Sequence, residues 1–170
     1  HDALPIFLAV WAYLLAVGPL RARIAPGTAY PRGPLAWFIA AVVSFYLAVG
    51  SPLDAMGEAF LFSAHMVQHN ILMYLTAVFA VLAVPGWMVD AFLERFPRAG
   101  RVFRFVMHPL SAGFSFTFVF CIWHFPVLYE AALHDKVLHM IEHLTMFGAS
   151  IQMCWPILNR SVRMGRMNWG

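Results

Sequence analysis

Long apolar segments separated by short polar stretches dominate the pattern of this chain. Five runs of 16 to 26 residues with at most one charged side chain recur, and a transmembrane helix needs about 20 predominantly apolar residues. We therefore predict an all-α fold, a polytopic bundle of transmembrane helices that forms one domain over residues 1–170. The five predicted spans are residues 4–20, 34–49, 59–84, 110–125 and 137–158.

Two of these runs depart from the simple pattern. The third apolar run continues to Val89, which makes it longer than the roughly 20 residues that one perpendicular helix needs. Because Pro85 followed by Gly86 is typical of a helix break, we expect the run to turn there into a segment at the membrane interface. The fifth run contains Glu142 and is therefore less apolar than the others.

Composition and charge agree with a membrane protein and predict its orientation. Hydrophobic residues make up 62% of the chain and charged residues 11%, whereas a soluble domain has about 25% charged residues. Arginines follow the first, third and fifth predicted spans, and positive residues in short loops stay on the cytoplasmic side. We therefore expect the amino terminus to lie on the outer side of the membrane. The arginines are Arg21, Arg23, Arg32, Arg95, Arg98, Arg101, Arg104, Arg160, Arg163 and Arg166. The sequence has no basic patch with interleaved aromatic residues, which is the pattern typical of nucleic-acid binding.

Five of the eight histidines fall inside or at the rim of apolar segments. Ionisable groups at membrane depth are costly and usually mark a functional site. Four of them form two pairs spaced four residues apart, which places both rings of a pair on one face of a helix. With the orientation above, all five converge on the outer leaflet. They are His65, His69, His124, His139 and His143.

This convergence favours a metal site. Two imidazoles one turn apart repel each other when protonated and need separate partners when neutral, and a shared metal solves both problems. A lone histidine in a membrane helix often only hydrogen-bonds across helices, however. For His124 that alternative is as good as ligation.

Glu142 adds a carboxylate to the second pair. Residues 139–143 read HMIEH, formally the HxxEH order of inverted zinc peptidases, in which the carboxylate is the general base. The match is short, and a carboxylate next to a metal-bound histidine more commonly orients the imidazole. We therefore favour an orienting role for Glu142 and assign no catalytic residue.

Four further side chains are weaker candidates. Met66 and Met140 lie beside the histidine pairs, and thioethers favour Cu(I), although methionine is also ordinary packing material. Cys121 precedes His124 by about one helical turn. Asp54 follows the stop at Pro52 and either caps a helix or helps an acidic mouth attract a cation.

Several ordered motifs carry a resemblance to a known family. They are Ser51 to Asp54, Ser63 to His69, Trp123 to Leu133, the Glu142-His143 pair and the Trp155-Pro156 pair. Together they resemble the CtaG family of bacterial membrane proteins. The resemblance implies a role in the assembly of caa3-type cytochrome c oxidase, by supplying or protecting copper. Members of that family have about seven spans, so the five predicted here indicate a fragment or a shortened relative.

The sequence thus predicts a copper-binding assembly factor, with the lipid bilayer and either oxidase subunits or a copper chaperone as its partners. Two other metal functions stay open at this point. One is an intramembrane zinc or iron enzyme that uses Glu142, and the other is a b-type haem electron carrier. A scaffold in which the imidazoles only bridge helices is the third alternative.

Overall fold

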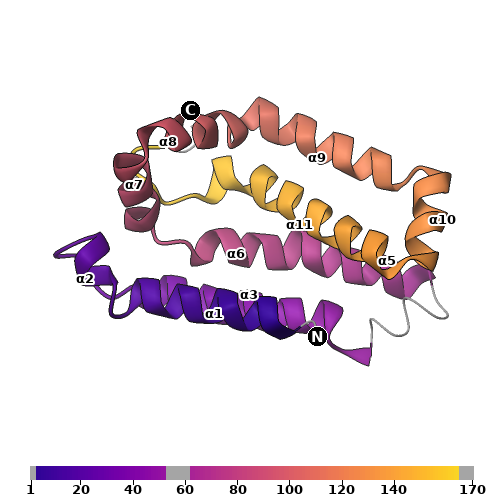
Figure 1. The fold of residues 1–170 in the computed structure, drawn as a ribbon, viewed down its shortest axis with the longest axis horizontal. Helices are drawn as coiled ribbons and strands as arrows, with labels where there is room; N and C mark the ends of the chain where they lie inside the picture. Colours follow the sequence, from indigo (N-terminus) through magenta and orange to yellow (C-terminus); the bar gives the residue numbers. More distant parts are fainter. Residues whose placement is uncertain (1–2, 53–61, 165–170) are drawn as a thin grey trace.

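The computed structural model describes residues 3–52 and 62–164, and within these ranges every regular element is a helix (Figure 1). The predicted all-α class is therefore confirmed for the part of the chain that the structure describes. The helices are α1 (Ala3–Val17), α2 (Arg21–Ile24), α3 (Arg32–Val49), α5 (Phe62–Asn70), the π-helical η1 (Ile71–Thr76), α6 (Ala77–Ala83), α7 (Gly86–Arg95), α8 (Pro97–Val106), α9 (Pro109–Trp123), α10 (Pro126–His134) and α11 (Lys136–Leu158).

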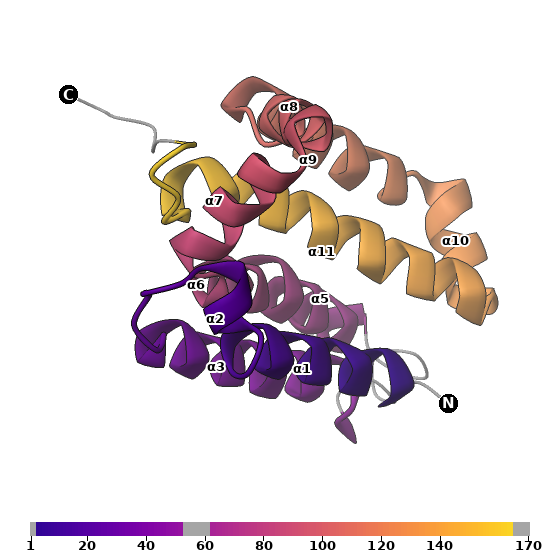
Figure 2. The same ribbon diagram turned by 60° about the vertical axis from the view of Figure 1, so that its left-hand side comes forward.

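Helix α11 lies at the centre of the arrangement. It packs against α9 on one side and against α6 and η1 on the other, and α10 contacts it near its start (Figures 1 and 2). On the far side of α6 and η1 lies α3, which presents the buried small residues Ala41, Ser44 and Ala48. Small side chains let membrane helices approach closely. The hydroxyl of Thr76 in η1 donates to the Ser44 hydroxyl at 2.9 Å across this contact.

Only some of the described helices are long and apolar enough to cross a membrane. Among residues 3–52 and 62–164, two stretches are long and apolar enough to cross a bilayer, α3 (Arg32–Val49) and the continuous Ser63–Ala83. The bent pair α8 and α9, with 61° between its halves, is a third if it forms one broken span. A helix occupies each predicted range, but five spans are not shown: the apolar part of α1 is short, and α11 carries Lys136, His139, Glu142 and His143 in its first turns.

The outer surface of the bundle is strongly apolar. Leu110 and Phe114 on α9 are 78% and 74% exposed, and Trp11 on α1 is 63% exposed. Apolar patches of this extent on a folded protein mark a surface that contacts lipid or another protein. Together with the candidate spans, they indicate a membrane protein.

A break after α6 brings the chain out of the bundle where the sequence predicted it. Val84 is extended, Pro85 follows, and α7 starts at Gly86 and runs across the end of the bundle (Figure 1). A Cβ atom on Gly86 would lie 2.2 Å from the Arg160 carbonyl oxygen. Only glycine therefore lets the chain after α11 pass beneath α7.

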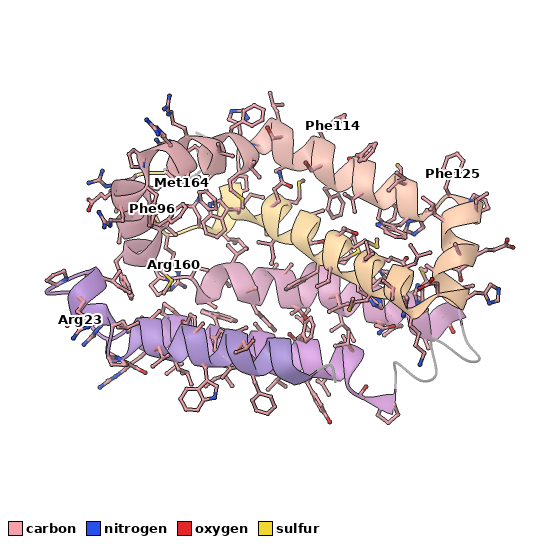
Figure 3. The ribbon with its side chains drawn as sticks, viewed as in Figure 1. Arg23, Phe96, Phe114, Phe125, Arg160 and Met164 are labelled. Atoms are coloured by element: carbon pink, nitrogen blue, oxygen red, sulfur yellow. The ribbon has the colours of Figure 1, made fainter. Side chains whose placement is uncertain are left out.

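The arginines among the described residues and the histidine pairs lie toward opposite ends of the molecule. Helix α2, helix α7 and the residues after α11 gather at one end, where Arg23 and Arg160 are labelled in Figure 3. Helix α10, the start of α11 and α5 lie at the other end. Segments far apart in the sequence thus place their arginines on one side.

Candidate metal centre

Two helices supply the polar side chains of the candidate site. His65 and His69 lie on α5, and His139, Glu142 and His143 lie on the first two turns of α11. The spacing of four residues places each histidine pair on one helix face. The Asp135 carboxylate caps α11 by accepting from the backbone amides of Val137 at 2.7 Å and Leu138 at 3.1 Å. This cap starts the helix one turn before His139.

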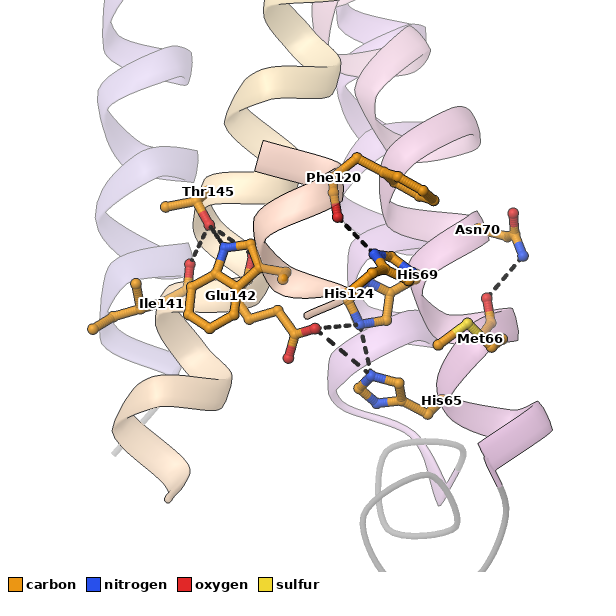
Figure 4. A network of polar contacts seen from close by, with 10 residues as sticks. His65, Met66, His69, Asn70, Phe120, His124, Ile141, Glu142 and Thr145 are labelled. Atoms are coloured by element: carbon orange, nitrogen blue, oxygen red, sulfur yellow. Dashed lines mark hydrogen bonds and ion pairs between the residues drawn. The ribbon is translucent and has the colours of Figure 1, made fainter. Parts of the chain in front are cut away.

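One group of possible ligand atoms joins the α5 pair to Glu142. The Nε2 atoms of His65 and His69 lie 2.9 Å apart. The Glu142 Oε1 atom lies 3.6 Å from Nε2 of His69 and 4.0 Å from Nε2 of His65 (Figure 4). Two nitrogens and one carboxylate oxygen therefore face a common point.

A second group joins His65 to the α11 pair. The ring centroid of His65 lies 5.4 Å from that of His139 and 6.0 Å from that of His143. The rings of His139 and His143 are 4.3 Å apart. In each group, one ligand atom from every residue lies within 4.8 Å of the others. His65 belongs to both groups, so the two groups share one ligand.

The site is buried and its polar atoms are incompletely paired. Only 2% of His65, 3% of Glu142 and 6% of His69 is exposed. Among the described side chains, Nδ1 of His65, Oε2 of Glu142 and Nε2 of His143 are buried without a hydrogen-bond partner. Buried polar atoms are normally satisfied, and an exception needs an explanation. A cation bound here would pair with the lone pairs of those atoms that carry no hydrogen, so this donor set fits a metal ion.

Neighbouring residues that the sequence analysis did not select hold this arrangement in place. Trp123 at the end of α9 donates from Nε1 to the Thr145 hydroxyl at 2.8 Å. That hydroxyl lies 2.7 Å from the Ile141 carbonyl and 3.0 Å from the Glu142 carbonyl, and donates to them. The contact ties α9 to α11 beside Glu142. In the sequence, the threonine three residues after Glu142 is the feature that could have indicated this contact.

Tyr129 on α10 closes the site from a third helix. Its ring centroid lies 6.2 Å from that of His65. Burial, and after it the nearby Glu142 carboxylate, raise the pKa of the Tyr129 hydroxyl above its usual value. The phenol therefore stays protonated at neutral pH and adds no charge to the cluster.

The remaining candidate residues belong to neither group. His124 ends α9 as an exposed residue, with Nδ1 2.7 Å from the Phe120 carbonyl oxygen and its ring stacked on Phe120 at 4.1 Å. Cys121 is an exposed free thiol, and Met140 is 52% exposed. Met66 is half-buried. Asp54 lies outside the described residues.

Comparison with known proteins places these residues in a family. The sequence model of the cytochrome c oxidase caa3 assembly factor family, Caa3_CtaG, matches residues 11–170. The chain belongs to this family. All members of the histidine and glutamate cluster lie within the matched range of the CtaG-family protein. Searches of curated proteins and of solved structures gave no significant match.

The chemistry of the cluster suits a transition metal. Imidazole nitrogens bind copper, zinc, iron and nickel, and a carboxylate can complete or orient such a set. Neither group contains a sulfur ligand. The donors of this CtaG-family protein could thus hold a transition metal, and they do not select one metal.

Proposed function

We propose that this protein is a membrane copper-binding assembly factor that helps to supply or insert copper into a haem-copper cytochrome c oxidase. The family supports the oxidase as the destination, and the buried cluster supports a metal as the cargo. Imidazole nitrogens, which make up most of the cluster, are suitable ligands for copper. The ion is carried rather than used, so no catalytic step is required.

The sharing of His65 between two ligand groups is the observation that carries the proposal. The His65 side chain could hold an ion together with His69 and Glu142, or together with His139 and His143, so it is a ligand on both sides of a transfer between the groups. Replacing one ligand at a time avoids a state in which the ion is bare in a low-dielectric interior, which would be very costly. The cluster is therefore suited to passing an ion on.

His124 is an auxiliary ligand in this proposal. Its Nδ1 is engaged by the Phe120 carbonyl, so the other ring nitrogen, Nε2, is the one that would bind metal. The ring would have to turn off Phe120 to reach the cluster from the end of α9. This requirement suits a ligand that acts while the metal is being exchanged.

We further propose that the arginine-bearing end lies in the cytoplasm and the metal site toward the outer face of the plasma membrane. The positive-inside rule is the argument for this orientation. The gathering of α2, α7 and the residues after α11 at one end of the molecule supports it, since a single membrane side can hold them all (Figure 1).

Metal analysis of the purified protein tests the proposal. Elemental analysis of the wild-type protein is compared with a double variant, His65→Ala with His139→Ala, and with His108→Ala as the matched control. His108 caps the start of α9 by accepting from the Leu110 amide and belongs to neither ligand group. We expect copper in the wild type and the control and none in the double variant. Equal metal content in all three would refute the site.

An intramembrane metalloenzyme is the second candidate, favoured by one observation. The Oε2 atom of Glu142 is buried without a partner, and a carboxylate free to accept a proton from a metal-bound water is what a general base requires. Glu142→Gln separates the two functions. If copper content and oxidase assembly both survive this substitution, a catalytic base at this position is excluded.

A haem electron carrier is the weaker alternative. The imidazole rings of the cluster contact one another, with centroids as close as 4.3 Å for His65 and His69. Axial ligands of a haem instead face each other across the macrocycle. A visible spectrum of metal-loaded protein decides the question, because a Soret band would indicate haem and contradict the copper proposal.

A further inference from the structure

A pocket connects the surface of the protein to the histidine cluster. It has a volume of about 150 Å³ and lies between the end of α10 and the start of α11. Two of its walls, His65 and His139, are buried members of the cluster, whereas His134 and Lys136 are exposed. The lining residues are His65, Ala132, Leu133, His134, Lys136 and His139.

The size of this pocket suits an ion with its small ligands. At about 30 Å³ for each water molecule, it holds roughly five. A hydrated ion, or a metal carried by one or two small donors, fits such a space. At its inner end lie the His65 and His139 rings, with centroids 5.4 Å apart and planes inclined by 27°.

The rim of the pocket offers a single ligand. Of the lining residues outside the cluster, Ala132 and Leu133 are apolar, and the ammonium group of Lys136 has three donors and no lone pair. Lys136 repels a cation and cannot bind it while protonated. The neutral imidazole of His134 can bind a transition metal. His134 is the last residue of α10, followed by Asp135 in an extended conformation.

We propose that this pocket is the port through which copper reaches the cluster, and that His134 is the first ligand of the incoming ion. The proposal rests on the proposed function, because it assumes that the cluster binds Cu(I). The bond between copper and His134 breaks as a bond to His65 or His139 forms, with no change in the oxidation state of the metal. His134 therefore affects the rate of loading, while the cluster sets the amount bound.

The rate of loading tests this role. Metal-free full-length protein in detergent is mixed with the coloured Cu(I)–bicinchoninate complex, and the loss of colour is followed in a stopped-flow instrument until the bound copper is constant. We expect His134→Ala to slow loading about tenfold, which corresponds to about 1.4 kcal/mol in the barrier. The final copper content should equal that of the wild type.

Two further variants distinguish the loss of the metal ligand at position 134 from a change in the shape or charge of the pocket rim. His134→Met keeps a soft ligand for Cu(I) at the rim and should load nearly as fast as the wild type. Lys136→Ala changes the same rim without removing a ligand and should load as fast or faster, because a repelling charge is lost.

The outcomes distinguish this proposal from the function on which it rests. If His134→Ala loads copper at the wild-type rate, or if both His134 variants load it slowly, the access role is refuted but the proposed function is not. A lower final copper content in His134→Ala would also overturn it, since His134 would then belong to the site itself. A wild-type protein that takes up no copper would instead contradict the proposed function.

Discussion

Substitution of His65 is the most informative perturbation of this protein, because His65 alone belongs to both ligand groups. His65→Ala leaves two ligands in each group. His69→Ala and His143→Ala each leave the other group intact, with three ligands. The shared position therefore predicts an unequal effect of three otherwise similar substitutions.

The size of the effect follows from linkage between binding and folding. Copper at 100 times its dissociation constant stabilises the folded wild-type protein by about 2.7 kcal/mol. If loss of His65 weakens binding about 100-fold, the same copper concentration stabilises the variant by only about 0.4 kcal/mol. His69→Ala and His143→Ala should keep most of the wild-type stabilisation.

The assay is thermal unfolding in detergent, followed by tryptophan fluorescence, with and without Cu(I) at one fixed concentration. The quantity compared is the shift caused by copper in each variant, because His65 is buried and its removal also leaves a cavity that lowers the stability of the metal-free protein. An equal loss of the copper shift in all three variants would refute the two overlapping groups. An undiminished shift in His65→Ala would remove His65 from the site.

Three other substitutions test the packing that holds the site. Trp123→Phe removes the hydrogen bond to Thr145 and puts a smaller ring at a buried position; we expect stability in chemical unfolding to fall by at least about 1 kcal/mol, and an unchanged value would show that the bond contributes nothing. Thr76→Val removes the hydroxyl that donates to Ser44 and should cost about 1 kcal/mol in the same assay; equal loss in a variant that also carries Ser44→Ala would identify this pair as the cause. Gly86→Ala places a methyl group against the Arg160 carbonyl; we expect about 1 to 3 kcal/mol of destabilisation, and a variant of wild-type thermal stability would contradict the close approach.

The amino-acid sequence by itself determined the helical class, the positions of the long apolar segments and which residues share a face of one helix. Hydrophobic runs and prolines act locally: the break at Pro85 and the caps of α9 and α11 follow from a few neighbouring residues. The spacing of four residues likewise brings each histidine pair together wherever its helix lies. These features were predictable because they depend on the period of a helix and not on its neighbours.

Only the tertiary structure decided which of these residues meet. It joins His65 to both histidines of α11 and turns Glu142 toward the α5 pair, because α11 packs centrally between α9 and α6. It places Nδ1 of His124 against the Phe120 carbonyl oxygen, because a histidine at the end of a helix can form a hydrogen bond with a carbonyl of the preceding turn. It also bends the chain by 61° between α8 and α9 and brings His134 to the same pocket as His65. No local pattern encodes these contacts, because each one depends on how helices distant in the sequence pack together.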